Sequence, residues 1–508
     1  MNFRALKFLQ KQHKALLLAV LAGVVFQLGF YHLRIVSYPF PLELREGSMM
    51  VTTQLLQHQQ NPYALQNQPA ATQVYGLLYP FLMLPWVAMF GETLIVYRSV
   101  AAIFVFIACY VCFKMIRHAG VSTVLSLFGT ATFYAYCLAY ASLAKPPNSL
   151  GLALFLLTIF LPHRFGFTNA ALFGSAICGI LAFATKSYFV LAIAYVALYA
   201  ILFRSMRVAA KYLAITTAIA VPLVLWVNHQ YEYYFYNSVL MHIGLAGHDV
   251  GHMLKQLADY AKSNPGITLI ALYAVAHYFT QFAISFTSGK FSKLDDLILE
   301  FKNQNLLYCC LSAFIFCTKM GLHQGNYLTY WLELVGPFLI ILTLQFVERN
   351  QHKILMVSLV VLNLLVVSHS SEIVPPMPKH LQEWPALESL VVQHQNLFTT
   401  PQMVPLLIKH NKPVYDNGST EFFTAPKRLD SRWFKPIVDA AIARNDQFMQ
   451  DLNAAIATQQ FDLIIVTTGA SMLIPEAKIA QQYEKVREVT VKMLFHERYQ
   501  LGIWTRKN

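Results

Sequence analysis

Charged residues are scarce in this chain. Of its 508 residues only 12% are Asp, Glu, Lys or Arg, whereas soluble domains average about 25%. Hydrophobic residues make up 56% of the chain and the mean hydropathy is +0.46. This composition excludes a disordered, fibrous or ordinary cytosolic protein and indicates a chain that crosses a membrane several times.

Cysteine and the common cofactor motifs are also sparse or missing. All seven cysteines lie in apolar runs, so disulfide bonds do not form a scaffold, and the C-x-x-C of Cys109 and Cys112 is interpreted as helix packing. The sequence has no P-loop, no nucleotide-binding glycine fingerprint and no Ser-His-Asp arrangement, so we expect no nucleotide or redox cofactor. The net charge of +13 comes without a dense basic run, so nucleic acid is not an expected partner.

The basic excess lies in the N-terminal three quarters of the chain. Residues 375–508 hold 15 Lys/Arg and 13 Asp/Glu, as a soluble domain does, whereas residues 1–374 hold 23 and 12 between apolar runs. We therefore predict a polytopic α-helical transmembrane module over 1–374 and a small C-terminal α/β domain over 375–508. Within the latter we expect a helix at Arg444–Gln459 and strands at Lys412–Asp416 and Phe461–Thr467.

Eleven apolar runs predict membrane spans. They fall near residues 15–36, 93–113, 121–143, 148–162, 168–184, 187–203, 209–228, 266–287, 305–318, 327–347 and 354–368. A further run, Tyr75–Gly91, reaches only about 25 Å, short of a hydrocarbon core of about 30 Å. If this run stays on the outer face, 15 basic residues lie inside and 8 outside; if it crosses, the numbers become 10 and 13. The positive-inside rule favours the first topology, with a cytoplasmic N-terminus and the C-terminal domain outside.

This topology gathers unusual polar residues on the outer face. The first outer loop, 37–92, carries Glu46. Lys145, Lys186 and Lys319 lie at the outer ends of three different spans, where converging ammonium groups would suit a phosphate at the membrane surface. The alternative is that each lysine simply extends to the membrane interface.

The long outer loop, 229–265, contains a candidate metal site. His248 and His252 are four residues apart, which places them on one helical face and would allow both to ligate a divalent cation. The alternative is an amphipathic interfacial helix with solvated histidines.

A series of short motifs follows the first span in order. It consists of Glu46, Asn61-Pro-Tyr63, Tyr75-Gly-x-x-Tyr79-Pro, Phe90-Gly91 with Arg98, and later Lys319-x-Gly321-x(4)-Asn326-Tyr327 with Glu333. This series, over residues 35–335, resembles the GT-C glycosyltransferases. The most similar group is the bacterial dolichyl-phosphate-mannose-protein mannosyltransferase-like group, which includes the lipid A aminoarabinose transferases.

The resemblance implies a membrane glycosyltransferase of the bacterial inner membrane. Such an enzyme moves a hexosyl or pentosyl group from a polyprenyl-phosphate sugar to a glycan, lipid or protein acceptor on the outer face, with inversion. Glu46 matches the first-loop acid of the family, which acts as general base or helps to hold a metal, and Lys186 matches a lysine after an Ala-x-x-Thr turn. Asn148 stands where relatives often have a second acid, which leaves any dependence on a divalent metal cation open.

The remaining candidates are substrate-binding residues. They are Glu43, Arg45, Tyr63, Tyr75, Tyr79, Asn148, Asn326 and Tyr327. Two other functions stay open, namely a transporter or flippase for lipid-linked glycans and a non-catalytic assembly subunit. Transporters usually show internal repeats and polar residues near the midplane. This sequence shows neither, which favours the enzyme.

Overall fold

The structure is a computed structural model. It describes residues 3–139, 146–241, 249–287, 330–370, 381–418, 435–468, 473–493 and 498–507. Among these residues, four helices are long and apolar enough to cross a membrane. They are Ala15–Ser37, Leu94–His118, Met206–Gln230 and Trp331–Arg349, and six further apolar helices are shorter.

The helices of the N-terminal part follow the predicted apolar runs closely. They are α1 (Phe3–Ser37), α4 (Leu94–His118), α5 (Thr123–Ala139), α6 (Pro146–Arg164), α7 (Asn169–Phe183), α8 (Leu191–Phe203), α9 (Met206–Gln230), α12 (Pro265–Thr287), α16 (Gly336–Arg349) and α17 (Lys353–Ser368). Helix α11 (Val250–Ser263) lies instead in the predicted outer loop 229–265. The predicted span at 305–318 lies outside the described residues, so the number of eleven spans stays a prediction.

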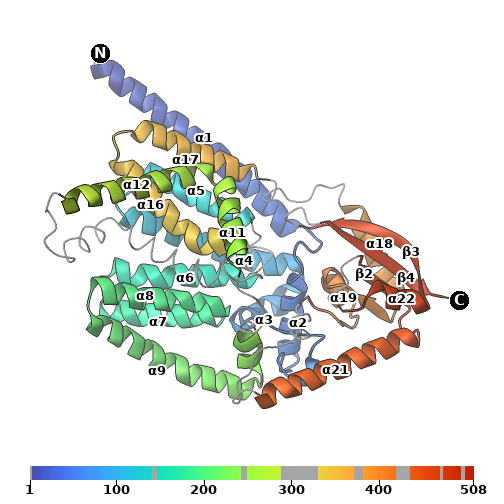
Figure 1. Ribbon diagram of the computed structural model, residues 1–508. Coiled ribbons are helices and arrows are strands. Elements are labelled where there is room, and N and C mark those ends of the chain that lie inside the picture. The colour runs from blue at the N-terminus through green and yellow to red at the C-terminus, as the bar shows by residue number, and fades with distance from the viewer. Residues whose placement is uncertain are drawn as a thin grey trace.

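Helix α4 lies between two groups of helices (Figure 1). On one side are α1, α5, α12, α16 and α17, and on the other are α6, α7, α8 and α9. Glycines allow the close contacts: a Cβ on Gly129 of α5 would lie 2.4 Å from the Leu344 side chain of α16. Small residues at such positions let membrane helices approach closely.

The segment between α1 and α4 folds into short elements. They are α2 (Glu46–Gln57), the 3₁₀ turn η1 (Leu65–Asn67) and α3 (Leu78–Phe90). Helix α3 covers most of the Tyr75–Gly91 run, but its 13 residues span only about 20 Å. Its location at the outer face stays a prediction.

The C-terminal segment contains a four-stranded sheet in the order β1-β2-β4-β3. Its elements are α18 (Glu383–Gln393), β1 (Leu397–Thr399), the 3₁₀ turn η7 (Pro401–Met403), α19 (Val404–Lys409), α21 (Lys435–Ala457), β2 (Leu463–Thr467), α22 (Glu476–Gln482), β3 (Tyr483–Lys492) and β4 (Arg498–Arg506). β1 pairs with β2 in parallel, and the other pairings are antiparallel. The strand predicted at Lys412–Asp416 was wrong, because this stretch is irregular and Pro413 has no N–H to donate to a sheet.

The C-terminal segment packs directly on the first loop. The Trp384 ring of α18 stacks on Phe40 with centroids 5.4 Å apart, and Asn417 Nδ2 donates to the Thr72 carbonyl over 2.9 Å. Arg444 of α21 donates to the Gln68 carbonyl over 2.8 Å. The loop is therefore held between the membrane helices and the C-terminal sheet.

Candidate functional site

Lys186 lies in a cage of three tyrosine rings. Its ammonium nitrogen is 4.7 Å from the ring centroid of Tyr75, 5.0 Å from that of Tyr188 and 5.4 Å from that of Tyr330. The side chain is only 6% exposed. Aromatic faces attract a cation, and this attraction strengthens when water is excluded. The cage therefore fixes a positive charge in a largely dry site.

Two polar side chains extend this site. Lys186 Nζ donates to Asn148 Oδ1 over 3.2 Å and to the Tyr330 hydroxyl over 3.5 Å. Asn148 Nδ2 in turn donates to Glu333 Oε2 over 3.3 Å. Both Asn148 and Glu333 are buried. The amide of Asn148 thus links a buried cation to a buried carboxylate.

Four separate segments supply these side chains. Asn148 lies in the first turn of α6, and Lys186 lies between α7 and the 3₁₀ turn η2 (Ser187–Val190). Glu333 lies in a short π-helix, η5 (Trp331–Val335), which leads into α16. π-Helical turns are rare in proteins, and those that occur often lie at functional sites.

The fourth segment is the first loop, which brings Tyr75 to Lys186. The N–H groups of Gly76 and Leu78 donate to the carbonyls of Thr185 and Ala184, each over 3.1 Å. The Tyr63 hydroxyl donates to the Tyr75 carbonyl. Burial raises the pKa of the Tyr63 hydroxyl well above its usual value, so this donor keeps its proton.

Gly76 is predicted to be essential for the backbone hydrogen bonds between residues 76–78 and residues 184–185. A Cβ on Gly76 would lie 1.9 Å from the Ala184 carbonyl oxygen, so Gly76→Ala must separate the two segments. We expect a loss of about 1–3 kcal/mol in unfolding free energy, measured as a lower melting temperature in detergent. Gly23→Ala in α1 is the matched control, because nothing lies within 4 Å of its Cβ position. Equal melting temperatures for both variants would contradict the prediction.

Glu46 lies in a different environment, paired with Arg98. Arg98 Nε lies 2.6 Å from Glu46 Oε1 and Arg98 Nη2 lies 2.8 Å from Oε2. The N–H of Leu42 also donates to Oε2, over 2.7 Å. The Arg98 side chain is 0% exposed and that of Glu46 is 2% exposed. Together they form a buried, bidentate ion pair.

This pairing bears on the role predicted for Glu46. A general base needs an oxygen within hydrogen-bond reach of the proton it accepts, and both oxygens of Glu46 already accept from Arg98. Arg98 also donates to the carbonyls of Ile35 and Phe40, at the end of α1 and in the chain after it. The Glu46–Arg98 pair thus holds the start of the first loop against the end of α1. The catalytic role of Glu46 stays a prediction, and this pairing does not favour it.

The other predicted site residues are dispersed. The Tyr79 hydroxyl donates to the Tyr97 carbonyl over 2.8 Å in a buried position, and Glu43 accepts from the Arg45 N–H over 2.7 Å. His252 lies in α11. Several predicted residues lie outside the described part of the chain, namely Lys145, His248, Lys319, Asn326 and Tyr327. Within the described part, no group of three or more His, Cys, Asp or Glu side chains is placed to hold a metal ion.

Sequence reasoning missed two of the three cage tyrosines. Tyr188 and Tyr330 were not among the predicted site residues, although Tyr188 is two positions from Lys186. The sequence analysis also named Arg98 without naming its partner, Glu46. An arginine inside an apolar run requires a counter-charge at the same depth, so its position was a sign that such a partner exists.

Two solved structures share the fold of this chain over nearly its whole length. Crystalline ArnT from Cupriavidus metallidurans bound to undecaprenyl phosphate matches with a TM-score of 0.54 and 12% identity, over 97% of this chain and 98% of ArnT. ArnT from the same organism in the apo state matches with a TM-score of 0.57 and 10% identity over the same shares. The chain has the fold of ArnT.

This finding confirms the resemblance at the level of the fold. The chain has a GT-C-type fold, and its apolar helices are those of a polytopic membrane protein. No protein-family model and no curated protein sequence matches the chain. With identities of 10% and 12%, the similarity to ArnT extends to architecture and not to individual residues.

Proposed function

We propose that this protein is a membrane glycosyltransferase that takes its sugar from a polyprenyl-phosphate carrier. The observation that carries the proposal is the buried Lys186 cage beside Asn148 and Glu333. One of the solved proteins with this fold was crystallised with undecaprenyl phosphate. We place the transfer on the outer face, as the distribution of basic residues predicts, and in a bacterial inner membrane, as the resemblance to the GT-C glycosyltransferases implies.

Lys186 would bind the phosphate of the donor. During transfer, negative charge builds on the departing polyprenyl phosphate as its bond to the anomeric carbon breaks. A preorganised cation in a site with little water stabilises such charge far more than it would in solution. Lys145 and Lys319 are proposed as further phosphate ligands, because both precede or follow spans at the same predicted face.

A carboxylate must accept the proton of the acceptor hydroxyl. We assign this role to Glu333, which is joined to Lys186 through Asn148. The acceptor oxygen then attacks the anomeric carbon, polyprenyl phosphate leaves with the bonding electrons, and the proton passes to Glu333. A single displacement of this kind inverts the anomeric configuration. Glu46 is the alternative base, and it would first have to lose its contacts with Arg98.

The lipid pool of the cell tests the proposal. In cells that lack the protein we expect one polyprenyl-phosphate monosaccharide to accumulate, as measured by mass spectrometry of extracted lipids. Wild-type protein should clear this lipid, whereas Glu333→Gln should not. An unchanged pool in all strains would contradict a transferase.

The purified protein separates transfer from transport. In detergent there are no membrane sides, so a flippase leaves the donor intact, whereas a transferase converts it to free polyprenyl phosphate when the acceptor is present. We expect release of polyprenyl phosphate that depends on acceptor. Accumulation of the donor in cells without any release in detergent would favour the transporter.

A further inference from the structure

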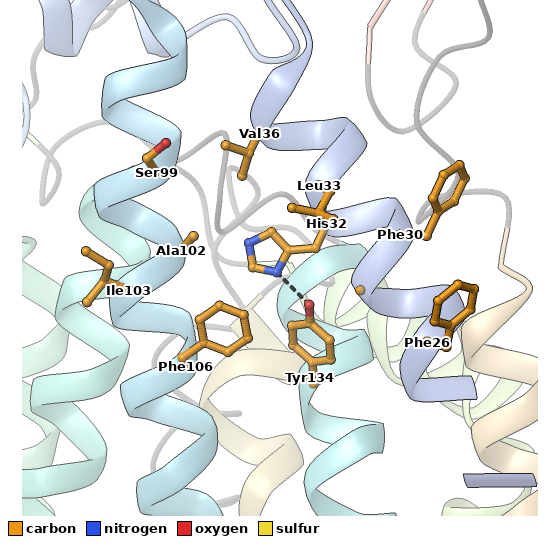
Figure 2. A pocket seen from close by; sticks show the side chains of 11 residues that line it. Phe26, Phe30, His32, Leu33, Val36, Ser99, Ala102, Ile103, Phe106 and Tyr134 are labelled. Atoms are coloured by element: carbon orange, nitrogen blue, oxygen red, sulfur yellow. Dashed lines mark hydrogen bonds between the residues drawn. The ribbon is translucent and has the colours of Figure 1, made fainter. Parts of the chain in front are cut away.

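A groove of about 740 Å³ lies between α1, α4 and α5, apart from the Lys186 cage. Its walls are apolar and include Phe26 and Leu33 of α1 and Ile103 and Phe106 of α4 (Figure 2). Helices α1 and α4 are both long and apolar enough to cross a membrane. Because Phe26 is 79% exposed and Leu33 is 70% exposed, the groove faces the hydrocarbon of the bilayer.

Three of the side chains that line this groove are polar, namely His32, Ser99 and Tyr134. His32 is 4% exposed, its Nδ1 is 2.6 Å from the Tyr134 hydroxyl, and its ring stacks on Phe106 at 5.1 Å. Its other nitrogen, Nε2, is buried and has no hydrogen-bond partner anywhere in the described structure. Figure 2 shows this nitrogen directed away from Tyr134, toward the space between Val36 and Ala102.

An unpaired nitrogen in a lipid-facing groove indicates a missing ligand. Nearly all buried polar groups in proteins have a partner, so each exception requires an explanation. The contacts with Tyr134 and Phe106 fix the orientation of the imidazole ring, so Nε2 cannot turn to another protein group. A ligand of this groove must combine a long apolar chain with one polar atom beside His32.

We propose that the groove binds an acyl chain of a glycerophospholipid and that His32 Nε2–H donates a hydrogen bond to the ester carbonyl of that chain. In this assignment the Tyr134 hydroxyl donates to Nδ1 of the neutral imidazole, and the ring proton lies on Nε2. His32 precedes the end of α1 at Ser37 by five residues, or about 7.5 Å along the helix. His32 therefore lies near the predicted outer end of the first span, on the side of the lipid headgroups.

A cation lies next to one wall of the groove. The Arg34 guanidinium lies 5.8 Å from the ring centroid of Phe30, which lines the groove. Arg34 follows His32 by two residues, toward the end of α1. A cation there complements an anionic headgroup. A polyprenyl chain carries no polar atom along its length, so a donor whose phosphate is bound at Lys186, as proposed above, would leave His32 Nε2 unpaired.

Ester and ether lipids test the proposal on the purified, delipidated full-length protein. Native mass spectrometry would follow the binding of a diester phosphatidylglycerol and of its diether analogue, which lacks both carbonyls. We expect wild type to bind the diester about tenfold more tightly, the effect of one hydrogen bond. His32→Leu should bind both lipids equally. Ala102→Trp, which fills the groove, should lose this binding event with both lipids.

A matched variant controls for added bulk. Leu225→Trp places the same side chain on α9, at a position that is 66% exposed and away from the groove, and should keep the diester preference. Equal affinity of wild type for both lipids would overturn the proposal, and this comparison needs no variant to fold. Displacement of the diester by polyprenyl phosphate would also overturn it, because the groove would then belong to the donor.

Discussion

Replacing Lys186 with methionine is expected to lower the rate of sugar transfer about a hundredfold to a thousandfold. This is the usual effect of removing one preorganised group that stabilises charge in a transition state. Methionine keeps the length and apolar part of the side chain, so it should still fit between Tyr75, Tyr188 and Tyr330. Transfer would be measured in detergent with saturating donor, to separate the chemical step from binding.

The same variant is also expected to lose some stability. Lys186→Met removes the cation that Asn148 links to the buried Glu333 carboxylate, and removing one member of a buried set of charges is destabilising, so we expect a lower melting temperature. Lys255→Met, at an exposed position on α11, is the matched control and should alter neither property. A full transfer rate in Lys186→Met would contradict a phosphate-binding role. Transfer that falls only in proportion to the loss of folded protein would instead indicate that Lys186 is structural.

Replacing Arg98 with leucine should be among the most destabilising changes in the protein. It would leave the Glu46 carboxylate buried without its partner and would remove donors from the carbonyls of Ile35 and Phe40. Breaking a buried ion pair from one side costs about 3–5 kcal/mol. We expect a marked fall in melting temperature and in the yield of folded protein. Arg164→Leu, at the exposed end of α6, should have little effect.

The double variant Arg98→Met/Glu46→Met separates the structural role of Glu46 from a catalytic one. Removing both charges leaves neither one buried alone, so stability should recover in large part relative to Arg98→Leu. If Glu333 is the base, the double variant should also keep measurable transfer. A well-folded double variant without any transfer would return the role of general base to Glu46.

The candidate residues were easier to predict than their contacts. Lys186, Asn148 and Tyr75 were each predicted as site residues, and the structure places all three around one buried position. Lys186 was predicted from its place at the end of an apolar run and from the resemblance, and Asn148 and Tyr75 from the motifs of the resemblance; their action on a substrate stays a prediction. The helix boundaries also follow hydropathy closely: the run predicted at 168–184 is α7, Asn169–Phe183.

The pairings could not be predicted from the same signals. Tyr330 meets Lys186 across 144 positions in sequence, and Arg98 meets Glu46 across 52. Such contacts depend on the order in which helices pack, which hydropathy does not report. Glu46 is an example. Its residue type and location suggest a general base, and only the structure shows that both of its carboxylate oxygens already accept hydrogen bonds from Arg98.

The packing of the C-terminal segment on the first loop has a consequence for biosynthesis. Helix α2 begins at Glu46, and Gly47 is so close to Val404 of α19 that a Cβ there would lie 2.6 Å from it. Asn417 reaches the same loop across 345 positions. A nascent chain that has inserted all its membrane helices therefore still lacks the surface that covers this loop. We therefore expect the loop to take its final form only once the last quarter of the chain has left the ribosome, so a truncated chain should insert into the membrane without the activity proposed above.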